Sequence, residues 1–201
     1  MFQASNFPDP NFDGGDEYLS IWPGLGGWNG NGTLVQSGTE SDIVCPNRSI
    51  DGTCPERVPR NYFWFEIWPD ESQMEVTNLL PNANDDVFTE SSWSGGVASF
   101  MLCDYTQNLC VKADQSSSQP GSSAEWIAER TAFNGSSDHY LPNFGTINFT
   151  GSIYQERGSW QTPSLGNAAT IDMGQGGHLL DQTETSSNYS MDFPINWLRG
   201  Y

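Results

Sequence analysis

The sequence predicts an all-β protein that folds as an antiparallel sandwich. Short runs of alternating apolar and polar residues recur along the chain, separated by turn residues, a pattern typical of strands joined by tight turns. Glycine and proline are frequent, with 21 and 12 among 201 residues, and no stretch keeps the period of an amphipathic helix. A chain of this length fits one domain, so we expect an irregular lead-in over residues 1–17 and a single β-sandwich domain over 18–201.

The run NYFWFEIW, residues 61–68, is the strongest strand signal in the chain. Because side chains alternate between the two faces of a strand, one face is wholly apolar and belongs in a core. That face carries Phe63, Phe65 and Ile67. The other face has the composition of a binding-site floor, aromatic rings around a carboxylate, and carries Tyr62, Trp64, Glu66 and Trp68. We expect further strands at 18–22, 33–37, 73–79, 93–104, 124–130, 146–154, 169–173, 179–184 and 189–193.

Three segments interrupt the strand pattern. Residues 23–32, PGLGGWNGNG, lack the GxGxxG spacing of a dinucleotide loop and precede no Walker GKS or GKT, so we interpret these glycines as turn residues. Residues 45–60 contain two cysteines and predict a disulfide-stapled loop. Residues 114–123, DQSSSQPGSS, predict a flexible polar loop.

The four cysteines form two local pairs, Cys45 with Cys54 and Cys103 with Cys110. Neither pair has the spacing of a zinc ribbon or of a CxxC redox motif, so short-loop disulfides are favoured over metal or redox chemistry. Four cysteines allow three pairings, of which we expect the local one.

Sequons and paired cysteines together indicate a secretory route. Disulfides persist in oxidising compartments, and N-glycans are added in the secretory pathway. No apolar run is long enough to span a bilayer, and the N-terminal residues show no signal-peptide core. We therefore expect a mature, secreted (extracellular) glycoprotein. The sequons occur at Asn31, Asn47, Asn134, Asn148 and Asn188.

The chain is strongly acidic, since 25 Asp and Glu against 7 Lys and Arg give a net charge of −18 at pH 7. Such a chain repels phosphate groups and anionic lipids, so we expect no nucleic acid and no membrane among its partners. It also repels itself at neutral pH and is relieved as carboxyls become protonated. This charge is consistent with a monomer that works in acid.

Several common catalytic motifs are missing from the sequence. The two histidines, His139 and His178, belong to no HExxH motif and to no acidic cluster with metal-ligating spacing, so we expect no metal and no other cofactor. The chain contains no GxSxG nucleophile elbow and no Asp-Thr-Gly or Asp-Ser-Gly of a pepsin-like enzyme. With these motifs excluded, carboxylate and amide side chains are the remaining candidates for catalysis.

Three segments carry that remaining chemistry. Glu66 lies in WFEIW, and Glu125 and Glu129 lie on one face of SAEWIAE. Most glutamates are simply solvated, but large apolar neighbours would partly desolvate these carboxyls and raise their pKa. The third segment, TLVQSGTE, carries Gln36 and, four residues on, Glu40.

The chain resembles the glutamic peptidases, or eqolisins, fungal acid proteases with relatives elsewhere that are insensitive to pepstatin. The matching runs cover most of the chain in the family's order, and SAEWIAE with an upstream VQSG is the most specific. The resemblance implies a concanavalin-like sandwich in which one curved sheet forms a substrate groove. The runs are YLSIWPGLGG, LVQSG, NYFWFEIWPD, SAEWIAE, NFGTINFTGS and ATIDM.

The resemblance also implies site residues. The catalytic Gln/Glu dyad of the family falls on Gln36 and Glu125. The chain departs from the family pattern at Pro23, in an enlarged loop at 45–60 and in its C-terminal run INWLRGY, which bear on groove shape and specificity more than on the chemistry. The substrate-binding residues, implied by the resemblance or by the aromatic face of 61–68, are Trp22, Glu40, Tyr62, Trp64, Glu66, Trp68 and Glu129.

The function predicted from these features is that of an acid endopeptidase acting on protein or peptide substrates. At about pH 3 an imidazole would be protonated and could not act as a base, whereas a carboxyl with a pKa of about 4 can still accept and donate a proton. Glu125 would activate a water and protonate the leaving amine, and the amide of Gln36 would stabilise the oxyanion. One alternative is a β-sandwich glycoside hydrolase that uses Glu66 and Glu125 about 5 Å apart; another is a lectin-like carbohydrate-binding protein.

Overall fold

The computed structural model describes residues 15–30, 32–132, 140–163, 168–183 and 192–199. In these residues the one helical element is a turn of 3-10 helix, η1 (Trp28–Gly30), and no helix is long and apolar enough to cross a membrane. The strands are β1 (Glu17–Leu25), β2 (Leu34–Val44), β3 (Val58–Trp68), β4 (Glu71–Val76), β5 (Val87–Ser94), β6 (Val97–Asp104), β7 (Leu109–Ser116), β8 (Ala124–Glu129), β9 (Thr146–Phe149), β10 (Tyr154–Glu156), β11 (Ser159–Gln161), β12 (Gly174–Gln175), β13 (His178–Leu179), β14 (Asp181–Thr183) and β15 (Phe193–Trp197).

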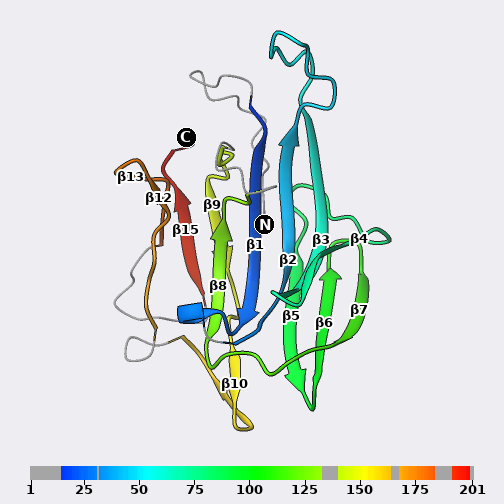
Figure 1. The fold of residues 1–201 in the computed structure, drawn as a ribbon, viewed down its shortest axis with the longest axis vertical. Coiled ribbons are helices and arrows are strands. Elements are labelled where there is room, and N and C mark those ends of the chain that lie inside the picture. The colour runs from blue at the N-terminus through cyan, green and yellow to red at the C-terminus, as the bar shows by residue number, and fades with distance from the viewer. Residues whose placement is uncertain (1–14, 31, 133–139, 164–167, 184–191, 200–201) are drawn as a thin grey trace.

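Five strands form one antiparallel sheet in the order β4-β3-β2-β1-β8. Its longest members are β2 and β3, which pair along their whole length, from Leu34 opposite Trp68 to Val44 opposite Val58. Figure 1 shows β8, β1, β2 and β3 side by side through the middle of the molecule.

A second layer of two three-stranded sheets packs against one face of this sheet. The sheet β5-β6-β7 shares a core with β2 and β3 that includes Phe63, Ile67 and Phe100. The sheet β14-β15-β9 shares a second core with β1 and β8 that includes Leu19 and Ile147. These side chains are at most 2% exposed. The two layers confirm the antiparallel β-sandwich that the sequence predicts.

Alternation along β3 divides its two faces as predicted. Phe63 and Ile67 are fully buried against the second layer, and Phe65 on the same face stacks on Phe100 with ring centroids 4.9 Å apart. Trp64 belongs to a separate cluster on the opposite face. Burying a large apolar side chain contributes about 1.5–3 kcal/mol, and a slip of one residue would exchange the two faces. The register of β3 is therefore strongly specified.

Pro23 lies in β1, an interior strand, where proline is rare because it lacks the N–H that a ladder requires. The ladder between β1 and β2 is interrupted at Trp22 and Pro23 and resumes where Gly24 lies opposite Gln36. The ladder between β1 and β8 continues through Pro23, which lies opposite Trp126. The missing donor is thus accommodated on the β2 side of the strand.

Some predicted strands are wrong in extent. The single strand predicted at 93–104 is two strands, β5 and β6, because Gly95 and Gly96 have positive φ (58° and 88°) and form a two-residue hairpin turn. The loop predicted at 114–123 begins too early, since 114–116 pair with β6 as the end of β7. No strand occupies 169–173, and the strand predicted at 146–154 ends at Phe149 and gives way to the hairpin of β10 and β11.

The two ends of the chain also differ from the prediction. β1 begins at Glu17, one residue inside the expected lead-in, and residues 1–14 of that lead-in lie outside the described residues. The C-terminal run that departs from the family pattern supplies most of β15, which pairs with β9 and β14. Most of the strand predicted at 189–193 also lies outside the described residues.

Both predicted disulfides are present. Cys45–Cys54 closes the loop between β2 and β3, which projects beyond the ends of these strands in Figure 1. Arg48 in this loop forms a salt bridge with Asp16 at 2.8 Å. Cys103 and Cys110 lie directly opposite each other in β6 and β7, with Cα atoms 4.1 Å apart. The local pairing is therefore confirmed.

Gly38→Ala should lower the free energy of unfolding. A Cβ at position 38 would lie 2.1 Å from the carbonyl oxygen of Ile21 and 2.7 Å from Cβ of Trp22, so β1 and β2 would have to move apart. Overpacking of this kind costs about 1–3 kcal/mol, which corresponds to a melting temperature lower by several degrees. Calorimetric melting at about pH 4 measures the change.

Ser116→Ala, at the exposed end of the edge strand β7, is the control and should melt like the wild type. Equal melting temperatures for the two variants would contradict the close approach of β1 and β2 at Gly38.

Candidate active site

Four neighbouring strands of the five-stranded sheet, β3, β2, β1 and β8, bring all nine predicted catalytic and substrate-binding residues to its outer face, the face away from the second layer. Residues directly opposite each other in antiparallel strands have side chains on the same face. Eight of the nine lie in three rows of paired residues that cross β3, β2, β1 and β8. The ninth, Trp68, is the last residue of β3 and lies just beyond the third row. These rows are Tyr62, Glu40, Ser20 and Glu129; then Trp64, Gly38, Trp22 and Ile127; then Glu66, Gln36, Gly24 and Glu125.

Gly24 separates Gln36 from Glu125 in the third row. Neighbouring strands are about 4.8 Å apart, so the Cα atoms of Gln36 and Glu125 are about 10 Å apart, and the residue of β1 that lies between them has no side chain of its own. A Cβ at Gly24 would lie 2.8 Å from Cζ3 of Trp22 and 3.1 Å from Cδ1 of Leu34. An amide and a carboxyl therefore flank one position that has no side chain and is bordered by apolar groups.

Gln36 is buried, with 7% of its surface exposed, and its amide is held by Glu66. Nε2 of Gln36 donates a hydrogen bond to Oε2 of Glu66 on β3. Oε1 of Gln36 has no hydrogen-bond partner among the described residues. The contact with Glu66 fixes the orientation of the amide and leaves one N–H and the carbonyl oxygen for other partners.

The Glu66 carboxyl is itself partly desolvated. Burial raises the pKa of Glu66, and the nearby Glu129 raises it further. Hydrogen bonds from Gln36 and from the backbone N–H of Gln73 lower this pKa and so oppose the effect of burial.

Glu125 is held by groups on two segments. Oγ of Ser123 donates to Oε1 of Glu125 at 2.7 Å. The backbone N–H of Trp28, in η1, donates to the same carboxyl. Burial raises the pKa of Glu125, and these two hydrogen bonds lower it in part. The carboxyl is therefore fixed in position, with a pKa above its ordinary value.

Aromatic side chains fill the outer face between the polar rows. Trp22 and Trp64 meet edge to face with centroids 6.5 Å apart, and Tyr62 joins them in one cluster. Nε1 of Trp22 donates to Oε2 of Glu129 at 3.1 Å. Glu129 is exposed at the end of β8, but desolvation by the groups around its carboxyl raises its pKa, and this hydrogen bond opposes the effect. The cluster both desolvates Glu129 and holds it in place.

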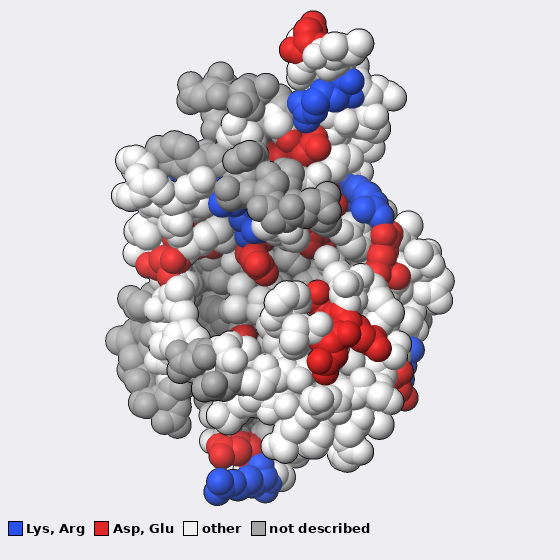
Figure 2. Space-filling view, viewed as in Figure 1, with Lys and Arg blue, Asp and Glu red and all other residues white. Residues whose placement is uncertain are grey.

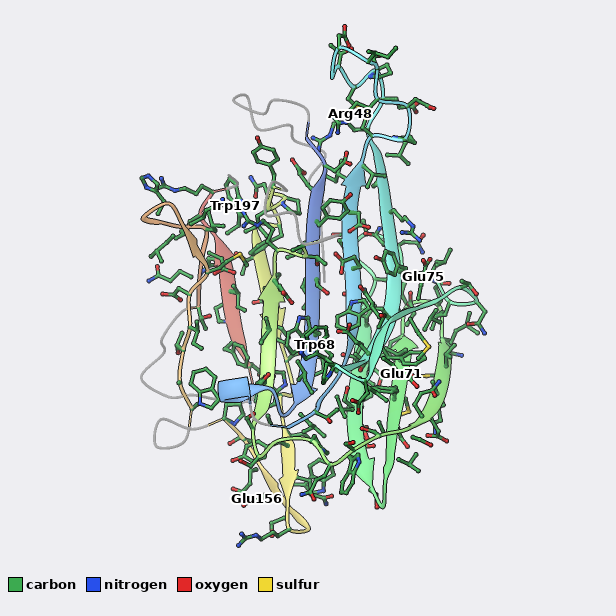
Figure 3. The ribbon with its side chains drawn as sticks, viewed as in Figure 1. Arg48, Trp68, Glu71, Glu75, Glu156 and Trp197 are labelled. Carbon is green, nitrogen blue, oxygen red and sulfur yellow. A yellow bond between two sulfur atoms is a disulfide. The ribbon has the colours of Figure 1, made fainter. Side chains whose placement is uncertain are left out.

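The burial of these rings differs from the prediction. Tyr62 and Trp64 are only 4% and 3% exposed, so they support the outer face from within and do not present open rings to a peptide. Trp68 is 59% exposed and remains open for contact. Figure 3 shows Trp68 near the centre of the view, where β3 ends.

Glu40 and Asp42 form a buried carboxyl pair farther along β2, with exposures of 0% and 1%. Oγ1 of Thr131 donates to Oε1 of Glu40 at 2.7 Å, but Oε2 of Glu40 and Oδ1 of Asp42 have no donor among the described residues. Two adjacent buried carboxyls avoid repulsion by keeping a proton. Burial, together with the neighbouring Glu40, raises the pKa of Asp42 to about 8, and burial raises the pKa of Glu40.

The surface around the site is acidic. Figure 2 shows acidic side chains gathered right of centre, and Asp70 and Glu71, at the turn between β3 and β4, are exposed. Of the basic residues near this face, Arg60 forms an ion pair with Glu75. Such a surface favours neutral or cationic partners over phosphates.

A cavity of about 380 Å³ lies within the sandwich, toward the second layer. Its lining comes mainly from residues 87–93 and 147–155. Gly24 and Glu125 of the third row are part of this lining, whereas Gln36 and Glu66 are not, so the cavity adjoins the Glu125 end of the row.

No group of three or more His, Cys, Asp or Glu in the described part of the chain could hold a metal ion. His178 is exposed in β13, and His139 lies outside the described residues. The site is thus built from carboxyl, amide and indole groups.

Four residues of this site are not predicted from the sequence: Gly24, Asp42, Ser123 and Trp28. The alternation along β2 could have found Asp42, because it continues the face of Glu40. Ser123 and Trp28 reach Glu125 only through the paths of two loops, which no local pattern in the sequence reveals.

Comparisons with known proteins agree with this architecture. Residues 3–193 match the model of the Peptidase A4 family. The fold is similar to aspergilloglutamic peptidase from Aspergillus niger, with a TM-score of 0.72 at 21% identity over 90% of this chain and 99% of that chain. A search of curated proteins finds no match.

Two other solved structures have similar folds. Scytalido-glutamic peptidase with a transition state analog inhibitor has a TM-score of 0.67 at 18% identity, over 92% of this chain and 85% of that chain. SCP-B, a member of the eqolisin family in a complex with the tripeptide Ala-Ile-His, has a TM-score of 0.60 at 17% identity, over 90% and 83%. At these identities the structural matches show a shared fold.

Thermal stability should fall as the pH rises from about 4 to about 8. The pKa values of Glu40 and Asp42 are raised in the folded protein, so the folded state keeps protons that the unfolded chain releases above about pH 4. The stabilisation is complete below that pH and is lost as the pH rises toward the folded pKa of Asp42, about 8. Thermal melts across this range measure the loss.

The variant Asp42→Asn separates this pair from the general negative charge. The amide keeps the shape of the carboxyl, can donate to Glu40 and does not ionise, so the variant should lose less stability over the same pH range than the wild type. Asp114→Asn, on the exposed edge strand β7, removes the same charge and should behave like the wild type. An equal loss in all three proteins would rule out the buried pair as its source.

Proposed function

We propose that this chain, which belongs to the Peptidase A4 family and is a glutamic-type endopeptidase, hydrolyses peptide bonds in acid with Gln36 and Glu125 as its catalytic pair. The family assignment rests on the match over residues 3–193. One observation supports the pair above all: Gln36 and Glu125 flank Gly24, the position of their row that has no side chain.

Glu125 supplies the acid–base chemistry in this proposal. As a carboxylate it takes a proton from a water molecule while the water oxygen attacks the scissile carbonyl carbon. The C–N bond of the tetrahedral intermediate then breaks as Glu125 gives that proton to the leaving amine. The hydrogen bonds from Ser123 and from the backbone of Trp28 keep the carboxyl in position for both steps.

Gln36 stabilises the oxyanion of the intermediate. Its amide is neutral at any working pH, and one N–H remains after the other is donated to Glu66. A single donor of this kind contributes about 3 kcal/mol to the stability of the transition state. The carbonyl oxygen of Gln36, which has no partner among the described residues, can accept a hydrogen bond from the attacking water.

The glycoside hydrolase alternative is not favoured by this geometry. Glu66 and Glu125 lie on β3 and β8, with β2 and β1 between them, so their Cα atoms are about 14 Å apart. Retaining glycosidases need their two carboxyls about 5 Å apart, and inverting ones about 6.5–9.5 Å, so both side chains would have to extend toward each other across Gln36 and Gly24. In addition, the carboxyl of Glu66 accepts the hydrogen bond of Gln36.

Secretion is the second part of the proposal. Both cysteine pairs form disulfides, which persist in oxidising compartments. The sequon residues Asn47 and Asn148 are exposed and so accessible to glycan addition, while the other three sequons lie outside the described residues. The net charge of −18 opposes self-association at neutral pH and supports a monomer.

Gln36→Ala and Glu125→Gln should each lower kcat/KM for denatured casein at about pH 3 by at least about 100-fold. The first change removes the oxyanion donor, and the second removes the group that accepts and returns the proton. Glu156→Gln, in the exposed β10–β11 hairpin at the foot of Figure 3, should leave kcat/KM unchanged. Thermal melting of each variant checks that the fold is intact.

The same assay separates the proposed function from its alternatives. Peptide release that pepstatin does not reduce supports the Gln/Glu pair, because pepstatin inhibits enzymes with an aspartate pair. Release of reducing sugar from xylan or glucan would support the glycosidase. If neither peptides nor sugars are released, a binding protein without catalytic activity would be supported. Full turnover by either variant would show that the pair is wrongly assigned.

Ser123→Ala should shift the pH dependence of the reaction. The hydroxyl of Ser123 favours the ionised form of Glu125, so its loss raises the pKa of that carboxyl. Because Glu125 must be ionised to act as a base, the rising limb of the kcat/KM profile should move to higher pH. The activity of the variant relative to wild type is then lower at about pH 3 than at about pH 5.

Ser122→Ala changes the exposed neighbouring serine and should keep the wild-type profile. An equal reduction by Ser123→Ala at every pH would mean that Ser123 has a structural role and does not position the base.

A further inference from the structure

The second layer of the sandwich is divided between two strand edges. β5 forms one side of the sheet β5-β6-β7, and β9 forms one side of the sheet β14-β15-β9. Among the described residues each of them pairs with one strand, β5 with β6 and β9 with β15. An edge strand presents N–H and C=O groups that no ladder uses. Figure 1 shows β5 on the β2 side of β1 and β9 on the β8 side.

The cavity of about 380 Å³ lies between these two edges. Its lining includes every residue of 87–93 in β5 and of 147–149 in β9. Neighbouring side chains in a strand point to opposite faces, so an unbroken run of lining residues means that each strand borders the cavity with its edge. Ile21, Pro23 and Leu25, on the inner face of β1, line the cavity from the five-stranded sheet. The two free edges thus face each other across the inner face of β1.

The cavity has room for a short piece of strand. A strand residue in a packed layer occupies about 160 Å³, given its rise, the spacing between strands and the thickness of the layer. The cavity therefore holds about two such residues with their side chains. Cavities of about 300–1,000 Å³ with mostly apolar linings are typical of ligand sites. The aromatic residues of this lining are Phe88, Trp93, Trp126, Phe149, Tyr154 and Trp160.

The charged groups of the lining are carboxyls. Glu90 in β5 and Glu125 in β8 line the cavity, whereas no Lys, Arg or His does. Oγ of Ser91 lies 2.9 Å from Oγ of Ser37 in β2, so Ser91 faces the five-stranded sheet. Its neighbour Glu90 therefore points to the opposite side of the layer, where it is exposed. A strand beside β5 would meet apolar groups on its inner side and a carboxyl on its outer side.

We propose that an extended peptide segment, in which apolar residues alternate with lysine or arginine, binds in this cavity as a strand between β5 and β9. Its backbone pairs with both edges, as in other sheets that an extended peptide joins. Its apolar side chains point toward the inner face of β1 and toward Trp126, and its basic side chains point outward beside Glu90. The net charge of −18 attracts such a peptide. This site does not require the catalytic pair, because Gln36 is not part of its lining.

The probe is a capped hexapeptide of alternating valine and lysine, and calorimetry measures its binding at about pH 6, where ordinary carboxyls are ionised. The protein carries Gln36→Ala, which lies outside the cavity lining and removes the proposed oxyanion donor. Chromatography afterwards checks that the peptide is intact. Binding should slow amide hydrogen exchange in β5 and β9 but not in β7, the other edge of the sheet that contains β5. The same peptide with N-methylated amides cannot pair and should bind at least about tenfold more weakly.

Two charge-reversed variants locate the peptide. Glu90→Lys should weaken binding of the valine–lysine peptide about fivefold and strengthen binding of a valine–glutamate peptide, because it reverses the charge beside the inserted strand. Asp114→Lys makes the same change at an exposed position of β7 and should leave both affinities unchanged. A hexapeptide with three valines followed by three lysines has the same composition without the alternation. It should bind at least about fivefold more weakly than the alternating peptide.

The opposing results are distinct from one another. Absence of binding, or binding that leaves β5 and β9 unprotected, would overturn the site. Equal weakening by Glu90→Lys and Asp114→Lys, or protection of β7, would show unspecific attraction to an acidic protein with exposed edges. Undiminished binding of the N-methylated peptide would show that the cavity takes side chains without strand pairing. A dimer in size-exclusion chromatography with β5 and β9 protected in the absence of peptide would make a second copy the occupant. None of these results depends on whether the protein cleaves casein.

Discussion

The antiparallel register of β3, β2, β1 and β8 is the constraint on which the rest of the structure depends. Backbone pairing aligns Glu66, Gln36, Gly24 and Glu125 in one row, although they come from segments far apart in the chain. A slip of one residue in any of these strands would turn its polar groups into the apolar core. The core side chains on the inner face therefore fix the geometry of the site, and Gly24 of β1 leaves room for the Trp22 ring beside the pair.

Desolvation of carboxyl groups makes both the stability of the fold and the proposed chemistry depend on acidic pH. Five carboxyls on or near the outer face have raised pKa values because their surroundings desolvate them, namely those of Glu40, Asp42, Glu66, Glu125 and Glu129. If all were ionised they would repel one another in a chain whose net charge is already −18. Hydrogen bonds from Thr131, Gln36, Ser123 and Trp22 offset only part of that cost. The same burial keeps a carboxyl able to exchange protons under acidic conditions.

Local patterns in the sequence predict well on which face of a strand a side chain lies, but they predict poorly how deeply it is buried and which path a loop takes. The alternation in NYFWFEIW correctly separates the core face of β3 from the outer face, and the cysteine spacing correctly predicts both disulfides. Periodicity cannot tell how deeply a ring is buried, so Tyr62 and Trp64 were expected to contact a peptide although neighbouring rings cover them. Gly95 and Gly96 turn a single apolar run into a hairpin because both adopt positive φ. The contacts of Glu125 with Ser123 and Trp28 depend on loop closure, which no sequence pattern specifies.

Gln36 shows what the structure adds to a resemblance. From the sequence it is an ordinary polar residue in a strand, and physical reasoning says only that an amide suits acid better than an imidazole does. The structure adds a neighbour that orients the amide, Glu66, and a glycine that separates it from Glu125 without an intervening side chain. Because both proposed catalytic groups lie on strands of one sheet, their relative position is rigid.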